Sequence, residues 1–335
     1  LCIIYLPIPE AHSASVGIWV AAGSRHATEK EQGISHFIEH MLFKGTTNRT
    51  SREISEEMDF LGGGLNAYTS KEYTRYYAQT LSENAVKAMD ILCDMILNPL
   101  MDEDEMERER QVILDEMAMY EDSGEDVAYE KLCAAIWPDS SLGRPITGVA
   151  ETVSSFTADD LRDYIRRHYT PERMVAVIAG GYDRQGMDEL LENTLGRLER
   201  GTGNVEFEIP EFNPSITLTK KKFEQTSLSI AVPGLAKGDP RKYAMMVLNF
   251  IVGGGASSRL YQRLREELGL AYSVYSSHSA STGTGLFTVT ASFSSDCQDQ
   301  VLSEINKLLD GVAEGVTAEE FERARAQIKA ANIMG

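Results

Sequence analysis

The chain of 335 residues contains two related halves. Residues 15–23, SVGIWVAAG, resemble residues 227–234, SLSIAVPG. Farther along, the run MDEDEMERERQVILDEM from Met101 resembles VTAEEFERARAQIKAAN from Val316. Resemblance between distant segments in the same order indicates a duplicated folding unit. The length agrees, because a chain of this size exceeds what one ordinary hydrophobic core accommodates.

The two copies are expected to differ in completeness. The first copy continues past its acidic helical run to MVAVIAG at residues 174–180, whereas the second ends soon after the corresponding run. We therefore expect the second domain to lack roughly 80 residues of counterpart at its C-terminal end. A polar stretch before Pro214 marks the join. The predicted organisation is a first domain at residues 1–205, a linker at 206–214 and an incomplete second domain at 215–335.

Composition excludes several classes of partner. The chain has 51 acidic and 32 basic residues, and its net charge of -19 repels nucleic-acid phosphates, so no nucleic-acid partner is predicted. Since no apolar stretch is long enough for a spanning helix, no membrane partner is predicted either. The four cysteines lie far apart without a CxxC pair, which fits a reducing compartment, and we expect a cytoplasmic protein.

The segment GISHFIEHMLFKG at residues 33–45 has the apolar spacing of an amphipathic helix. His36, Glu39 and His40 lie on the face opposite the apolar stripe. Two imidazoles one helical turn apart can bind one metal ion, and the glutamate beside them is placed to accept a proton from a water on that metal. The alternative is an ordinary solvated helix face.

A catalytic zinc site needs a third protein ligand, and the best candidate is Glu116. It belongs to a second predicted helix at residues 102–120, which begins with acidic residues and then becomes apolar. Glu109 and Glu116 are two turns apart, on one line of this helix between Met106, Val112, Ile113 and Met119. We expect that line to be buried. A carboxylate among apolar neighbours is costly unless it is paired, and a divalent cation is a strong partner.

The sequence is compatible with three roles for Glu109. The residue is an alternative metal ligand, a residue that orients a ligand or the water, or one half of an internal salt bridge. The second role fits best, because side chains around a metal commonly hold its ligands in place.

Several segments together resemble a known peptidase family. Besides HFIEH and the later Glu116, they are NAYTSKEYTRYY at residues 66–77, ERERQVILDEM at 107–117, YTPERMVAVIAG at 169–180 and SSRLYQRLREELGLAYSVY at 257–275. The chain resembles the family of pitrilysin, insulinase and mitochondrial processing peptidase, the inverted zincins, whose HxxEH reverses the more familiar HExxH. Within that family it is most similar to the bacterial two-domain members that resemble processing peptidases.

The resemblance implies a zinc metalloendopeptidase with one Zn²⁺ per chain. His36, His40 and Glu116 are then the metal ligands, and Glu39 is the general base. By the same resemblance, Asn66 and Ala67 lie on an edge strand that pairs with an extended peptide substrate. The sequence alone also permits an ordinary turn there. Further along the chain, the resemblance implies that Arg265 and Tyr272 reach the substrate and the developing oxyanion from the second domain.

The second copy has lost the metal ligands. Glu109 aligns with Ala324 and Glu116 with Ala331, and the segment near residues 248–252 has no histidine. We therefore expect one metal-binding domain and one relative that contributes only to a cleft between them. The resemblance also implies the fold class: α+β, with each domain a largely antiparallel sheet that has helices packed on one face.

Two questions of function stay open from the sequence. The first is whether the chain is a peptidase or a noncatalytic structural or partner subunit of the same family. The second is assembly, for which a homodimer and a complex with a related second subunit are both compatible with the resemblance.

Overall fold

The computed structural model describes residues 1–201 and 207–334. The chain forms two compact units. The first combines Leu1–Ala118 with Arg144–Glu206, and the second combines Met119–Gly143 with Phe207–Gly335. The predicted boundary at residue 205 lies outside the described residues, and the predicted domain limits stay a prediction.

The first unit is built on a five-stranded sheet with the order β1-β5-β2-β4-β3. The parallel pair is β1 with β5, and the remaining pairs are antiparallel. The strands are β1 (Cys2–Pro7), β2 (Ser13–Val20), β3 (Gly64–Thr69), β4 (Thr74–Leu81) and β5 (Met174–Gly180). Strand β3 ends the order and is therefore an edge strand, as expected for Asn66 and Ala67.

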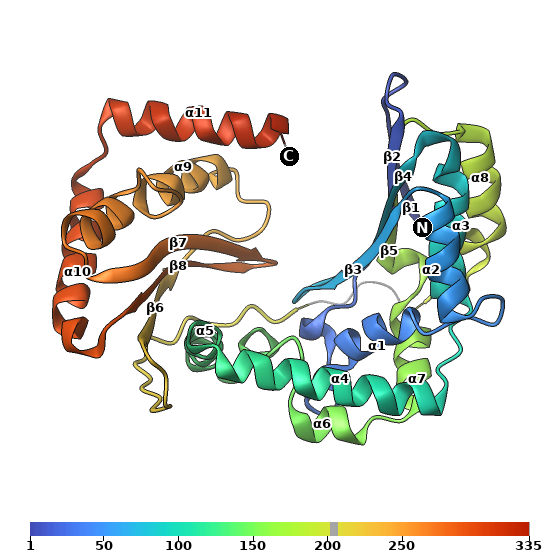
Figure 1. The fold of residues 1–335 in the computed structure, drawn as a ribbon, viewed down its shortest axis with the longest axis horizontal. Coiled ribbons are helices and arrows are strands. Elements are labelled where there is room, and N and C mark those ends of the chain that lie inside the picture. The colour runs from blue at the N-terminus through green and yellow to red at the C-terminus, as the bar shows by residue number, and fades with distance from the viewer. Residues whose placement is uncertain (202–206, 335) are drawn as a thin grey trace. The chain divides into compact units, whose positions relative to one another are not determined.

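Helices cover one face of this sheet. Along β2, the alternate residues Ala14, Val16, Ile18 and Val20 are buried in the core, as the period of two predicts. Figure 1 shows α2, α3 and α8 together on one side of the strands. The helices of the unit are α1 (Ile34–Leu42), α2 (Ser51–Phe60), α3 (Ala85–Leu97), α4 (Glu103–Asp122), α6 (Ala150–Ser155), α7 (Ala158–His168) and α8 (Arg184–Asn193).

The second unit has a three-stranded antiparallel sheet with the order β6-β8-β7. Its strands are β6 (Thr226–Pro233), β7 (Ala271–Ser281) and β8 (Thr284–Phe293). Its helices are α5 (Gly124–Ile136), α9 (Lys242–Val252), a π-helix at Tyr261–Glu267, α10 (Gln298–Glu314) and α11 (Ala318–Met334). One core joins α9 and α10 to the sheet, and α5 packs through a separate cluster that includes Leu286.

The duplication read from the sequence is present in the strand order. In the first unit β2 and β3 both pair with β4, and in the second unit β6 and β7 both pair with β8, all antiparallel. The similar segments found in the sequence occupy β2 and β6, and the similar acidic runs occupy α4 and α11. The α+β fold with two related domains is confirmed.

A glycine sets the start of α1. Gly33 has φ +90°, and its carbonyl accepts the first hydrogen bond of the helix from the Phe37 amide at 2.9 Å. A Cβ at this position would lie 2.5 Å from the Thr147 carbonyl oxygen. Both the left-handed backbone and the close approach therefore require glycine.

We predict that Gly33→Ala lowers the free energy of unfolding by about 2 kcal/mol, because the side chain adds backbone strain and overlaps Thr147. Gly64→Ala is the matched control, since nothing lies within 4 Å of a Cβ there. Urea denaturation of both variants measures the difference. Equal stability of the two would contradict the role given to Gly33.

Candidate metal centre

The metal-binding face of α1 is set by how the helix packs. Its apolar residues Ile34, Phe37, Ile38, Met41 and Leu42 are all buried, as the spacing predicts. His36 and His40 project from the other side of the helix, one turn apart, and their ring centroids are 4.7 Å apart. The apolar stripe thus fixes the rotation of the helix, and the rotation aims both imidazoles in one direction.

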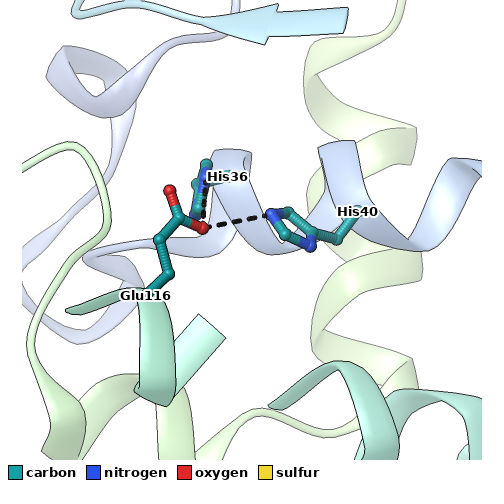
Figure 2. Close-up of side chains that lie close together, drawn as sticks. All are labelled: His36, His40 and Glu116. Carbon is teal, nitrogen blue, oxygen red and sulfur yellow. Dashed lines mark ion pairs between the residues drawn. The ribbon is translucent and has the colours of Figure 1, made fainter. Parts of the chain in front are cut away.

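Glu116 on α4 meets both imidazoles. One carboxylate oxygen, Oε2, lies 3.7 Å from His36 Nε2 and 3.6 Å from His40 Nε2, as Figure 2 shows. The three residues form a group able to hold a metal ion, with ligand atoms all within 4.8 Å of one another. A tetrahedral zinc ion with ligand bonds of about 2.0–2.2 Å separates its ligand atoms by about 3.4 Å. The donor set and its spacing therefore fit zinc.

The environment of Glu116 differs from the sequence prediction. Val112 and Met119 were expected to be buried beside it, but they are 47% and 72% exposed. Buried residues on α4 are Met106, Glu109 and Ile113. The predicted stripe is therefore wrong at Val112 and Met119. The helix packs on the core through a neighbouring line of side chains, since Ile113 is buried and Leu114 and Met117 pack against the same core.

Burial keeps His36 available as a ligand. Burial, together with a smaller effect of the neighbouring His40, lowers the pKa of His36 to about 4. At neutral pH the ring is uncharged and one nitrogen has a free lone pair. Its Nδ1 is buried and has no hydrogen-bond partner among the described residues, whereas Nε2 faces Glu116 and is the atom available to a metal ion.

Glu109 contacts His40 and a lysine at the same time. Its Oε2 lies 3.1 Å from His40 Nδ1, and its Oε1 lies 2.5 Å from Lys44 Nζ. A hydrogen bond from Nδ1–H to a carboxylate fixes the tautomer in which Nε2 is free to bind metal. One carboxylate thus makes the orienting contact and the salt bridge that the sequence left as alternatives. Glu109 is not part of the group formed by His36, His40 and Glu116 in the described residues.

Glu39 is held by a threonine. The Thr69 hydroxyl donates a hydrogen bond to Glu39 Oε2 from the end of β3. The Thr74 hydroxyl oxygen lies 3.2 Å from that of Thr69 and donates its own hydrogen bond to the Ala22 carbonyl at 2.7 Å. The Thr69 hydroxyl is therefore free to donate to Glu39. Burial raises the pKa of the Glu39 carboxyl, while the Thr69 hydrogen bond and His40 lower it. A carboxylate with a raised pKa beside a metal group is suited to accepting a proton.

Thr69 and Lys44 contact site residues, but the sequence does not predict either contact. Lys44 lies one turn beyond His40 but outside α1, which ends at Leu42, so helical spacing was only a weak signal. Thr69 is joined to Glu39 by the packing of β3 on α1, and nothing in the local sequence indicates that contact.

The predicted substrate-binding residues fall into two groups. On β3, Asn66 Oδ1 accepts a hydrogen bond from the Ala67 amide at 2.8 Å. Arg265 and Tyr272 lie in the second unit, where the Arg265 guanidinium carbon is 5.7 Å from the Tyr272 ring centroid. Arg265 belongs to the π-helix, a rare element, and Tyr272 is 71% exposed on β7. Their contact with a substrate stays a prediction.

No helix in residues 1–201 and 207–334 combines the length and the apolar character needed to cross a bilayer.

Comparison with known proteins gives consistent matches along the chain. A family model described as Insulinase (Peptidase family M16) matches residues 3–149, and one described as Peptidase M16 inactive domain matches residues 155–328. A Bacillus subtilis protein named an uncharacterized zinc protease is 41% identical over 96% of this chain and 78% of its own length.

Two solved structures share the fold. One, described as the peptidase M16 inactive domain from Pseudomonas fluorescens, has a TM-score of 0.90 and 20% identity and covers 99% of this chain and 81% of its own. The other, described as a protease from Helicobacter pylori, has a TM-score of 0.88 and 21% identity. That match covers 99% of this chain and 82% of the Helicobacter pylori chain.

We predict that Glu109→Gln weakens binding of a divalent cation by about 10–100-fold, because His40 loses the carboxylate that fixes its tautomer. Competition with a chromophoric chelator measures the affinity. Glu107→Gln on the same helix is the control, since that side chain is 76% exposed. Unchanged metal affinity in Glu109→Gln would contradict the role of Glu109 in orienting His40 and would leave its salt bridge with Lys44 as its role.

Proposed function

The chain belongs to the insulinase family, peptidase family M16, and we propose that it is a zinc-dependent endopeptidase that cleaves extended, unfolded peptides. The observation that carries the proposal is the convergence of His36, His40 and Glu116 on one point, with Glu39 on the same helix turn. Relatives named zinc proteases support the choice of zinc. We propose one zinc ion per chain. The cytoplasmic location stays a prediction.

His36, His40 and Glu116 hold the zinc in this proposal. When bound, zinc at such a site supplies an acidified water and a Lewis acid for the scissile carbonyl. Glu39 takes the proton of the attacking water on a carboxylate oxygen and later passes it to the leaving amine. Thr69 keeps the Glu39 carboxylate in place by its hydrogen bond. Glu109 keeps His40 in the tautomer that binds metal.

The edge strand β3 supports an extended substrate. A strand at the end of a sheet offers unpaired backbone groups to another chain, and pairing there requires an extended peptide. The Ala67 amide is engaged by the Asn66 carboxamide at 2.8 Å, which covers part of this edge. In the proposed complex, the peptide backbone replaces the Asn66 side chain as the hydrogen-bond acceptor of the Ala67 amide. Folded substrates are excluded because their backbone groups are already paired.

We predict that Glu39→Gln lowers kcat for an unstructured fluorogenic peptide by at least about 100-fold, because the amide cannot accept the proton of the water. Zinc content should stay the same, since Glu39 is outside the ligand group. Glu56→Gln on α2, an exposed side chain, is the control and should keep full activity. Turnover retained in Glu39→Gln would remove the residue from the role of base.

Metal analysis separates the peptidase from a noncatalytic subunit of the same family. We predict about one zinc per chain after purification without chelator, measured by inductively coupled plasma mass spectrometry, and loss of the metal in His36→Ala. A noncatalytic subunit has no need to keep the metal. A content below about one half zinc per chain, unchanged in His36→Ala, would favour the structural alternative.

A further inference from the structure

An arginine surrounded by aromatic rings lies on the open face of the five-stranded sheet, opposite the helices. Arg75 on β4 is directly across from Trp19 on β2 and from Tyr68 on β3. Tyr77 follows two residues later on the same strand and the same face. We call Trp19, Tyr68, Arg75 and Tyr77 the aromatic–arginine patch.

The Arg75 guanidinium contacts the rings of Tyr68 and Tyr77 and has no acidic partner among the described residues. Its Cζ lies 4.7 Å from the Tyr77 ring centroid and 5.4 Å from that of Tyr68, distances typical of cation–π contacts. Its Nε is buried and makes no hydrogen bond within the described part of the chain. No carboxylate of the described residues lies within 4.0 Å of it.

Most arginines of the described residues pair with a carboxylate, in a chain where acidic residues outnumber basic ones by 51 to 32. Arg49, for example, contacts Asp90 and Asp94. Arg265, like Arg75, instead contacts aromatic rings. A guanidinium presents its donors in a planar fork that matches a carboxylate, so an unpaired one in contact with rings is prepared for such a ligand.

The patch lies next to the proposed substrate path. Tyr68 directly precedes Thr69, whose hydroxyl contacts Glu39. Every second side chain of a peptide paired with β3 points to the open face of the sheet. Such a peptide would run two strand spacings from β4, about 10 Å, which an arginine and a glutamate side chain span together.

We propose that Arg75 is a specificity-determining residue that binds a carboxylate of the peptide substrate. The inference rests on the proposed peptidase function and names a preference within it. Two sources share this chemistry: the side chain of an Asp or Glu near the scissile bond, and the C-terminal carboxylate of a short peptide.

Matched peptide pairs test the proposal on the whole chain. In fluorogenic peptides, Glu replaces Gln at each of the positions flanking the scissile bond in turn, and a second set compares free with amidated C-termini. We expect about a tenfold higher kcat/KM for the carboxylate at one position, equivalent to about 1.4 kcal/mol. In Arg75→Gln, the ratio of kcat/KM for the Glu peptide to that for the Gln peptide should fall to about one. In Arg75→Glu, a peptide with Lys at that position should be cleaved with a higher kcat/KM than the Gln peptide. A structural role alone would not reverse the preference.

Arg52→Gln is the control, since Arg52 is an exposed arginine of α2 that pairs with Glu56, and its ratio should equal that of the wild type. Cleavage of all peptides with ratios near one would overturn the role of Arg75 and leave the peptidase function standing. A preference that survives in Arg75→Gln would overturn it too. A preference confined to free C-termini would identify the terminal carboxylate as the ligand.

If no peptide is cleaved, the peptidase function fails, and binding then decides the role of Arg75. Fluorescence anisotropy of the same labelled peptides with the wild-type chain and with Arg75→Gln gives the Kd values directly. Equal Kd values for Glu and Gln peptides would contradict the carboxylate site. Tighter binding of the Glu peptide that Arg75→Gln removes would support it.

Discussion

The spacing of one helical turn between His36 and His40 is the constraint on which the candidate site depends. It brings two Nε2 atoms to within 3.7 Å of one Glu116 oxygen only because α1 is anchored by its buried apolar face. Gly33 lets the chain enter that helix beside Thr147. The contacts of Glu109 and Thr69 then hold His40 and Glu39. Metal binding, in this view, is a consequence of helix packing.

Duplication explains how the chain divides its roles. The strands β2-β4-β3 of the first unit and β6-β8-β7 of the second have the same order, so the same scaffold was available twice for a metal site. In the second unit the positions aligned with Glu109 and Glu116 are Ala324 and Ala331, and Ala324 is buried without any charge to satisfy. The second copy therefore keeps the fold without counterparts of the proposed ligands Glu116 and His36, and the family model described as inactive covers most of it, at residues 155–328.

Sequence reasoning succeeded where local periodicity decides the outcome. The apolar spacing of residues 33–45 predicted the buried face of α1, and the alignment of the halves predicted a duplicated folding unit. It failed where tertiary contacts decide. Val112 and Met119 have the expected helical spacing but are exposed, because the helix packs on the core through Ile113, Leu114 and Met117. The hydrogen bond from Thr69 to Glu39 joins elements that periodicity does not relate. The contacts of Arg75 with the tyrosine rings likewise depend on cross-strand neighbours.

The most direct test is the position of the metal itself. Crystals of the zinc-loaded chain, measured on both sides of the zinc absorption edge, give an anomalous difference map that locates zinc independently of any assumption about activity. A peak is expected about 2.0–2.2 Å from His36 Nε2, His40 Nε2 and a Glu116 oxygen. A zinc peak at other residues, with these three side chains free of metal, would contradict the proposed centre.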